Sequence, residues 1–247
     1  MRSPLAGQLM RILMFVAFMG AFAAPGATQP LALLNAQDRA QWKAVGRVNS
    51  AGYTSRRGCT GTLIAPDLVV TAAHCVTSAN GLAMTKHFVA GWYRGQFRAH
   101  RIAREVIVHP LYALAQGKAR YAYDVAVLVL NDPIPEALVA PIPLKPSGTP
   151  YRNEALLLGY ENVRPHALSG RDGCPLLAAN DQFRTYACAV VNGSSGGAAI
   201  AQGADGPSLA AVLVARQGDA GLALAVPISE WLRDRWQDAL DREKRRP

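Results

Sequence analysis

Three short segments of the sequence contain residue types that together perform acyl transfer. They are TAAHC at Thr71–Cys75, YDVAVLVL at Tyr123–Leu130 and GSSGG at Gly193–Gly197. A serine hydroxyl is a poor nucleophile at neutral pH and needs a neighbouring base to accept its proton. Histidine suits that task because its unperturbed pKa lies near neutral pH. The segments therefore suggest Ser195 as the nucleophile, His74 as the base and Asp124 as the carboxylate that orients the base.

Each of these residues also has an ordinary structural explanation. His74 could be a core histidine, Asp124 a strand cap, and Ser195 part of a flexible Gly/Ser loop. Asp124, however, stands directly before an apolar strand, so it should be buried, and a buried carboxylate needs a partner such as an imidazole N–H. The occurrence of all three residues in one chain favours the catalytic interpretation.

The order of the three residues distinguishes between folds. In α/β-hydrolases the serine comes first and the histidine last; in subtilisins the aspartate comes first; in chymotrypsin-like peptidases the order is His, Asp, Ser. No histidine follows Ser195, which excludes the α/β-hydrolase interpretation of G-x-S-x-G. The sequence resembles the chymotrypsin-like serine peptidases from CTGTLIAPDLVVTAAHC (Cys59–Cys75) through LLLGY (Leu156–Tyr160) to the serine loop. It is most similar to the bacterial V8-like branch, because Cys188 stands a short loop ahead of the serine.

The resemblance implies an all-β fold of two six-stranded antiparallel β-barrels with a C-terminal α-helix. The expected segments are a first barrel at about 42–132, a proline-rich connector at about 133–150, a second barrel at about 151–227 and a helix at about 228–243. Short β-branched runs separated by Gly, Pro and Asn agree with such barrels. Residues up to about Gln41 read as a mobile lead-in to this peptidase domain of residues 28–247.

The catalytic residues of the family can be assigned to matching positions of this sequence. The resemblance implies a serine-type endopeptidase with a His74–Asp124–Ser195 triad, and an oxyanion hole formed by the N–H groups of Gly193 and Ser195. It implies a polypeptide substrate and no cofactor or metal. An esterase on the same scaffold would share the triad, and an HtrA-type protease is disfavoured because no peptide-binding domain follows the helix.

Four cysteines in an exported chain are expected to form disulfides. By the family pattern the bridges are Cys59–Cys75 around the histidine loop and Cys174–Cys188 before the serine. The alternative, free or metal-binding thiols, is weak because the chain has no C-x-x-C pair.

Two departures from trypsin affect activation and specificity. Ser194 replaces the aspartate that precedes the nucleophile in trypsin, and Ala44–Arg47 replaces the I-V-G-G start, so activation by N-terminal insertion is not expected. A non-catalytic, protease-fold binding protein is therefore the alternative function.

The expected substrate pocket has no carboxylate, which favours a small or apolar P1 residue over Lys or Arg, although Arg216 could attract an acidic side chain. Its residues are Ala189, Val190, Val214, Ala215 and Arg216.

The N-terminus resembles a secretory signal peptide. Arg2 and Arg11 precede an apolar run at Ile12–Ala24 that is too short to span a bilayer, with cleavage expected between residues 23 and 27. The alternative is an uncleaved membrane anchor. The signal predicts a periplasmic or extracellular protein without stable membrane insertion after cleavage.

Charge and the remaining motifs add little to function. Removing Arg2 and Arg11 lowers the formal charge from +9 to +7, but the basic residues are scattered, which argues against nucleic-acid binding. The basic tail at Arg242–Arg246 reads as a solvated helix end.

An apolar stripe predicts that the final helix packs on the second barrel, with its tryptophans in the core. Oligomeric state has no sequence signal. The remaining histidines read as surface or satisfied residues: His87, His100, His109 and His166.

Overall fold

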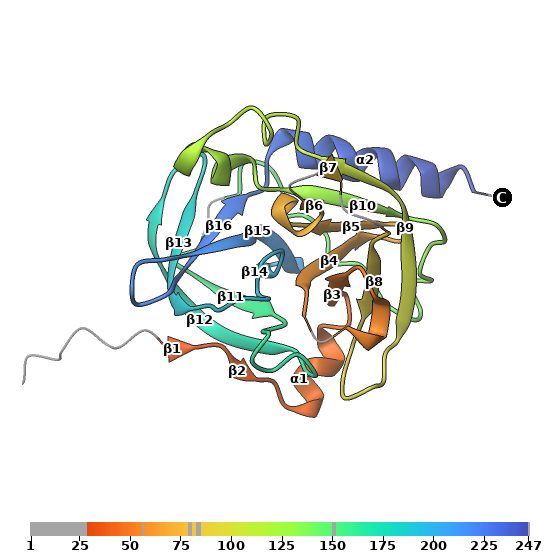
Figure 1. The fold of residues 1–247 in the computed structure, drawn as a ribbon, viewed down its shortest axis with the longest axis horizontal. Helices are drawn as coiled ribbons and strands as arrows, with labels where there is room; N and C mark the ends of the chain where they lie inside the picture. Colours follow the sequence, from red (N-terminus) through yellow and green to blue (C-terminus); the bar gives the residue numbers. More distant parts are fainter. Residues whose placement is uncertain (1–28, 56, 79–80, 83–84, 150–151, 247) are drawn as a thin grey trace, which may run out of the picture.

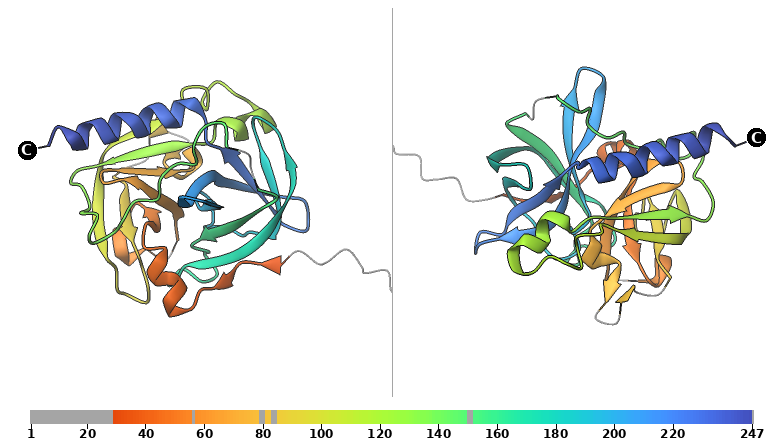
Figure 2. Two further views of the ribbon diagram at one scale, coloured as in Figure 1. Left: turned by 180° about the vertical axis from the view of Figure 1, so that it is seen from behind. Right: turned by 90° about the horizontal axis from the view of Figure 1, so that it is seen from above.

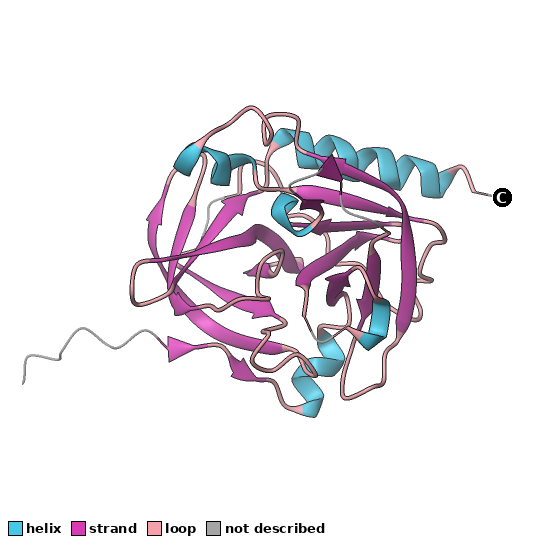
Figure 3. Cartoon of the chain, viewed as in Figure 1, coloured by secondary structure: helices cyan, strands magenta, loops and turns pink. Residues whose placement is uncertain are grey.

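The computed structural model describes residues 29–246 except 56, 79–80, 83–84 and 150–151, and it contains two antiparallel β-barrels side by side (Figures 1 and 3). The predicted signal peptide lies outside these residues. No helix within the described part of the chain is long and apolar enough to cross a membrane.

The first barrel is a closed sheet of six strands in the order β10-β5-β4-β3-β8-β9. Its core includes valines, leucines and a phenylalanine that are almost completely shielded from solvent, such as Val45, Leu63, Val69, Phe88 and Leu128. β-Branched residues suit a pleated surface buried on one face. The strands are β3 (Val45–Asn49), β4 (Cys59–Ala65), β5 (Leu68–Thr71), β8 (His87–Ala90), β9 (Ala99–Val108) and β10 (Ala126–Leu130). A small hairpin of β6 (Thr77–Ser78) and β7 (Gly81–Leu82) projects from it.

The second barrel also has six strands, in the order β13-β16-β15-β14-β11-β12, and pairing between β12 and β13 closes it. The strands are β11 (Glu154–Gly159), β12 (Ser169–Ala179), β13 (Arg184–Ala189), β14 (Ala198–Gly203), β15 (Gly206–Gln217) and β16 (Leu222–Pro227). The two barrels confirm the predicted fold class.

The connector between the barrels is bonded to both of them. Ile134 N–H donates to the carbonyl of Pro66 in the first barrel, and Lys145 N–H donates to the carbonyl of Leu209 in the second. Because its backbone groups are satisfied on each side, the connector fixes how the barrels face one another.

The C-terminal helix α2 (Glu230–Lys244) begins at Ser229, whose side chain accepts a hydrogen bond from Leu232 N–H. It lies against the first barrel, contrary to the prediction that it packs on the second. Trp236 Nε1 donates to the carbonyl of Ile64 in β4 at 2.7 Å. Figure 2 shows the helix crossing from the end of β16 over the other barrel. The apolar stripe identified the buried face, but a stripe does not specify its partner.

The basic tail at the end of α2 is not simply solvated. Arg242 and Arg246 pair with the buried carboxylate of Asp67, at 3.3 and 3.1 Å, and Arg104 lies 3.9 Å from it. A buried carboxylate needs such partners, so these contacts fasten the helix end to the first barrel.

Residues 29–41 are not the mobile lead-in that the sequence suggested. Strand β1 (Gln29–Pro30) pairs in parallel with β13, strand β2 (Ala32–Leu33) pairs with β12, and helix α1 (Ala36–Gln41) follows. The side chain of Leu31 is 0% exposed and belongs to the core of the second barrel. This segment is therefore an outer layer of the second barrel.

Candidate active site

A cleft of about 420 Å³ is lined by residues from both barrels, and it contains His74, Asp124 and Ser195. His74 follows β5 and Asp124 precedes β10 in the first barrel, whereas Ser195 lies between β13 and β14 in the second. The fold thus brings together three residues that are separated by 50 and 71 positions along the chain.

The imidazole of His74 is held by Asp124. Nδ1 of His74 lies 2.6 Å from Oδ2 of Asp124, and the backbone N–H of His74 donates to Oδ1 at 2.9 Å. The side chain of His74 is 40% exposed and that of Asp124 only 3%. A carboxylate at Nδ1 favours the tautomer with the proton on that nitrogen, which leaves Nε2 able to accept a proton. The pair therefore has the arrangement of an oriented general base.

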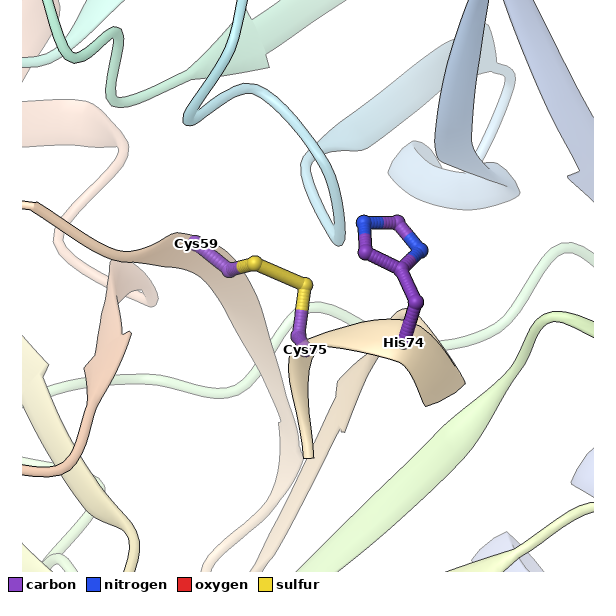
Figure 4. Close-up of side chains that lie close together, drawn as sticks. All are labelled: Cys59, His74 and Cys75. Carbon is purple, nitrogen blue, oxygen red and sulfur yellow. A yellow bond between two sulfur atoms is a disulfide. The ribbon is translucent and has the colours of Figure 1, made fainter. Parts of the chain in front are cut away.

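The histidine occupies the 3₁₀ helix η2 (Ala73–Cys75), which is anchored by a disulfide between Cys59 and Cys75. Figure 4 shows this bridge beside the imidazole. The two sulfurs and His74 offer ligand atoms within 4.8 Å of one another, but thiolates are needed to bind a metal and these sulfurs are bonded together. The bridge is thus a structural support for the histidine. The second predicted bridge, Cys174–Cys188, is also present.

The serine loop is fastened to the first barrel by Thr60, a buried residue of β4. The N–H of Thr60 donates to the carbonyl of Ser195 at 2.8 Å, and its hydroxyl donates to the carbonyl of Gly193 at 2.9 Å. The same hydroxyl accepts the N–H of Tyr160 at 2.8 Å. Sequence analysis did not identify Thr60, although its contacts set the position of the loop.

Gly193 and Gly196 are required by conformation and by space. Gly193 has φ of +102°, and a Cβ there would lie 2.5 Å from the carbonyl oxygen of Tyr160. Gly196 has φ of +79°, and its Cβ would lie 2.0 Å from the carbonyl oxygen of Thr60. Both are too close for any real Cβ, so the backbone approaches its neighbours as only glycine permits.

The N–H groups of Gly193 and Ser195 have no hydrogen-bond partner in the described part of the chain. No acceptor among the described residues takes either of them, whereas the N–H of Gly196 donates to Leu213 and that of Gly197 to Ser194. Two neighbouring free amides beside a nucleophile can bind an anionic oxygen.

Ser194 is almost fully buried, with 1% exposure. Its N–H donates to the carbonyl of Val191 at 3.1 Å, and its hydroxyl has no partner among the described side chains and backbone groups. A serine cannot form the ion pair made by an aspartate at this position. The loop is instead held by hydrogen bonds, among them those from Thr60 and the bond from Gly196 N–H to the carbonyl of Leu213.

The cleft beside Ser195 is lined by some, but not all, of the residues predicted for the substrate pocket. Val190, Val214, Ala215 and Arg216 line the cleft, whereas Ala189 is not among its lining residues. The opposite wall is formed by residues that the sequence did not suggest, and burial raises the pKa of one of them, Tyr112. These residues are Tyr112, Gly117, Arg120 and Tyr121.

The other histidines lie outside the cleft lining. His87 Nδ1 and His100 Nε2 are 2.8 Å apart and share a hydrogen bond, while His109 packs between Tyr123 and Trp231. His166 accepts the N–H of Arg94 through its carbonyl.

Comparison with known proteins identifies the family and agrees with the fold. The family model described as Trypsin matches residues 35–230. A Glu endopeptidase structure, in complex with MPD, superposes with a TM-score of 0.71 at 16% identity, covering 86% of this chain and 96% of that one. A thermostable serine protease, AL20, from an extremophilic microorganism superposes with a TM-score of 0.65 at 16% identity, covering 81% of this chain and 98% of that one. At such identity these likenesses concern the fold, whereas the family match spans most of the sequence. The chain belongs to the trypsin family of serine endopeptidases.

Proposed function

We propose that this endopeptidase cleaves peptide bonds through an acyl-enzyme on Ser195. The observation that carries the proposal is the 2.6 Å contact between His74 Nδ1 and Asp124 Oδ2, in a cleft that Ser195 also lines. Nε2 of His74 would take the hydroxyl proton as Oγ bonds to the substrate carbonyl carbon. The protonated imidazole would then give that proton to the departing amine, and water would release the acyl group by the reverse roles.

The negative charge that develops on the substrate carbonyl oxygen would be stabilised by the free N–H groups of Gly193 and Ser195. Backbone donors that are fixed before reaction cost no reorganisation in the transition state, and losing one such donor lowers the rate by about 10²–10³. The bonds from Thr60 support this arrangement because they hold the carbonyl sides of both residues.

The proposed P1 preference is for a small or apolar side chain. Val190, Val214 and Ala215 line the cleft, and Asp124 is the only carboxylate among its described lining residues. That carboxylate is engaged by His74, so nothing in the lining can pair with Lys or Arg at P1. Arg216, and Arg120 on the opposite wall, add positive charge that would favour acidic side chains elsewhere in the substrate.

The mechanism is tested by the effect of Asp124→Asn on peptide hydrolysis. We expect kcat to fall by about 10⁴-fold with little change in KM, because the asparagine would leave the imidazole in the wrong tautomer. Asp132→Asn is the matched control, since Asp132 is exposed and lies outside the cleft lining. Equal activity of both variants would contradict the assigned role of Asp124. If the chain were a non-catalytic binding protein, the wild type and both variants would show no hydrolysis.

The specificity is tested separately with a peptide library. Cleavage after Ala, Val or Leu should dominate, and Arg216→Ala should reduce any preference for acidic residues near the cleaved bond. A profile dominated by Lys or Arg at P1 would refute the pocket assignment without affecting the catalytic mechanism.

Export through an N-terminal signal peptide is also proposed. The disulfides Cys59–Cys75 and Cys174–Cys188 support it because such bonds persist in oxidising compartments. N-terminal sequencing of the mature protein should find its first residue between positions 24 and 28. Recovery of protein that still begins at Met1 would favour the uncleaved anchor.

A further inference from the structure

A second pocket, here called the α1 pocket, lies where helix α1, the first barrel and the second barrel meet. Its volume is about 210 Å³, and it shares no lining residue with the catalytic cleft. Figure 1 shows α1 at the edge of the molecule opposite α2. Three cationic side chains line the α1 pocket, and none of its described lining residues carries a carboxylate. The cations are Arg39, Lys43 and Arg98.

Arg39 is fixed in place. Its guanidinium lies 3.7 Å from the ring centroid of Tyr93, and its Nη1 donates to the carbonyl of Leu34. An arginine has five N–H donors in a rigid fork, so the stacked guanidinium keeps donors for a further ligand. The cation is held by an aromatic face and a carbonyl, and neither neutralises it.

The other two cations approach the pocket across Gly91. A Cβ at this residue, where φ is +60°, would lie 2.9 Å from Cγ of Arg98 and 3.7 Å from Cβ of Lys43. The glycine therefore makes room for both side chains at one place. Of the ion pairs that the described residues form, none includes Arg39, Lys43 or Arg98.

The nearest acidic residue along the helix is already engaged. Asp38 accepts a hydrogen bond from Asn35 Nδ2 at 2.7 Å, as part of the cap of α1, and it does not line the pocket. Trp92, which does line it, has a buried indole N–H without an acceptor among the described residues. The lining of the α1 pocket thus includes three positive side chains and a residue with an unused buried donor, and its described residues supply no counter-charge. Like charges gathered around one small pocket repel one another.

We propose that the α1 pocket is a binding site for a phosphate or sulfate group. The fork of Arg39 would bind two oxygens of the oxyanion, and Lys43 and Arg98 would neutralise its second charge. Phe97 lines the same pocket and is 41% exposed, so it offers an aromatic surface to an organic carrier of the group.

Binding at this site would join α1 to the first barrel. Arg39 belongs to α1, whereas Arg98 directly precedes β9, and Lys43 stands between α1 and β3. A ligand that binds only the folded protein stabilises it in proportion to the logarithm of its concentration above Kd. The oxyanion should therefore raise the thermal unfolding temperature, and above Kd the rise should be linear in the logarithm of its concentration.

The test measures that temperature for the purified protein during titration with inorganic phosphate or phenyl phosphate, with ionic strength held constant by NaCl. We expect a rise with either ligand that fits ln(1 + c/Kd), where c is the ligand concentration, and so gives an apparent Kd. A lower apparent Kd for phenyl phosphate would identify an aromatic ester as the preferred source, and equal values would identify the free oxyanion.

Arg98→Ala and Lys43→Ala should each weaken the apparent affinity, on the order of tenfold, as expected for the loss of a charge-assisted contact. Arg152→Ala is the control, because Arg152 is exposed and lies outside the α1 pocket. The proposal would be overturned by the same rise in all four proteins, which would indicate a general salt effect, or by no rise in the wild type above that in NaCl of equal ionic strength. Neither result depends on peptidase activity.

Discussion

The hydroxyl of Thr60 is bonded to two parts of the second barrel at once. It donates to the carbonyl of Gly193 and accepts the N–H of Tyr160, which are 133 and 100 residues away along the chain. Through these bonds a single side chain of β4 sets the orientation of the peptide that follows Gly193. We therefore regard Thr60 as a positioning residue for the oxyanion hole, in a protein where Ser194 cannot form the ion pair of trypsin.

Thr60→Val should lower kcat with little change in KM. Valine has nearly the same shape, so the variant removes the two hydrogen bonds and leaves the packing in place. The loss should be about tenfold or more, and smaller than the 10²–10³ caused by removing an oxyanion donor itself. Steady-state kinetics on a peptide substrate measures both parameters.

Thr62→Val is the matched control for this experiment. Thr62 is buried on the same strand, but its hydroxyl has no partner among the described residues. Its substitution should leave kcat unchanged. If the two variants lose equal activity, the role assigned to Thr60 is wrong and the effect belongs to the packing of β4.

At the scale of elements, the segment of residues 29–41 extends the second barrel. Its backbone pairs with β12 and β13, and Arg164 and Arg171 donate to the carbonyls of Leu31 and Pro30. Strand β1 pairs with Cys188 and Ala189, close to the serine loop. The segment therefore supports the strand that leads to the nucleophile.

Leu31→Ala should destabilise the protein by about 2–5 kcal/mol, as expected when a fully buried leucine is truncated. Leu33→Ala should cost little, because Leu33 is 46% exposed in the neighbouring strand β2, whereas Leu31 is 0% exposed. Urea unfolding of the two variants measures the difference. Equal stabilities would mean that the segment does not pack on the barrel in solution.

The sequence predicted the elements whose signal is local. His74, Asp124 and Ser195 stand in short motifs, and the resemblance that these motifs carry predicted the two barrels, with which the β-branched runs agree. It did not predict the packing of α2 on the first barrel, because the apolar stripe defines a face and not a partner. It also did not predict that residues 29–41 form ordered strands and a helix. There, a single buried side chain, Leu31, anchors the segment, and the sequence shows no periodic pattern that would reveal it.

Thr60 could not be found from sequence for a related reason. A buried threonine in a strand has no local signature, and its partners are distant in the chain. The substrate pocket was predicted in part, since Val190 and Arg216 line the cleft, but Arg120 comes from a 3₁₀ helix, η3 (Gly117–Tyr123), with no recognisable motif.

At the scale of the whole molecule, stability should fall below neutral pH. Burial, followed by the nearby His87 and Arg101, lowers the pKa of His100, and burial lowers that of His109. Below the ordinary value of 6.5 the unfolded chain binds protons that the folded protein does not. The unfolding free energy should therefore decrease as pH falls from about 6.5 toward the lowered pKa values.

Urea unfolding at pH 7.5 and pH 5 measures this dependence. His100→Gln should reduce the loss of stability between the two pH values, because glutamine does not titrate. His166→Gln, which replaces an exposed histidine, serves as the control. An unchanged difference in His100→Gln would show that other groups govern the pH dependence.

The most direct measurement of the central claim is intact-mass analysis after treatment with a fluorophosphonate, which reacts with an activated serine. We expect one adduct per chain, located on Ser195 by peptide mapping. That adduct should be absent in Ser195→Ala and in His74→Ala, and retained in Ser147→Ala, which changes an exposed serine of the connector. Absence of labelling in the folded wild-type protein, or labelling that persists in Ser195→Ala, would contradict this claim.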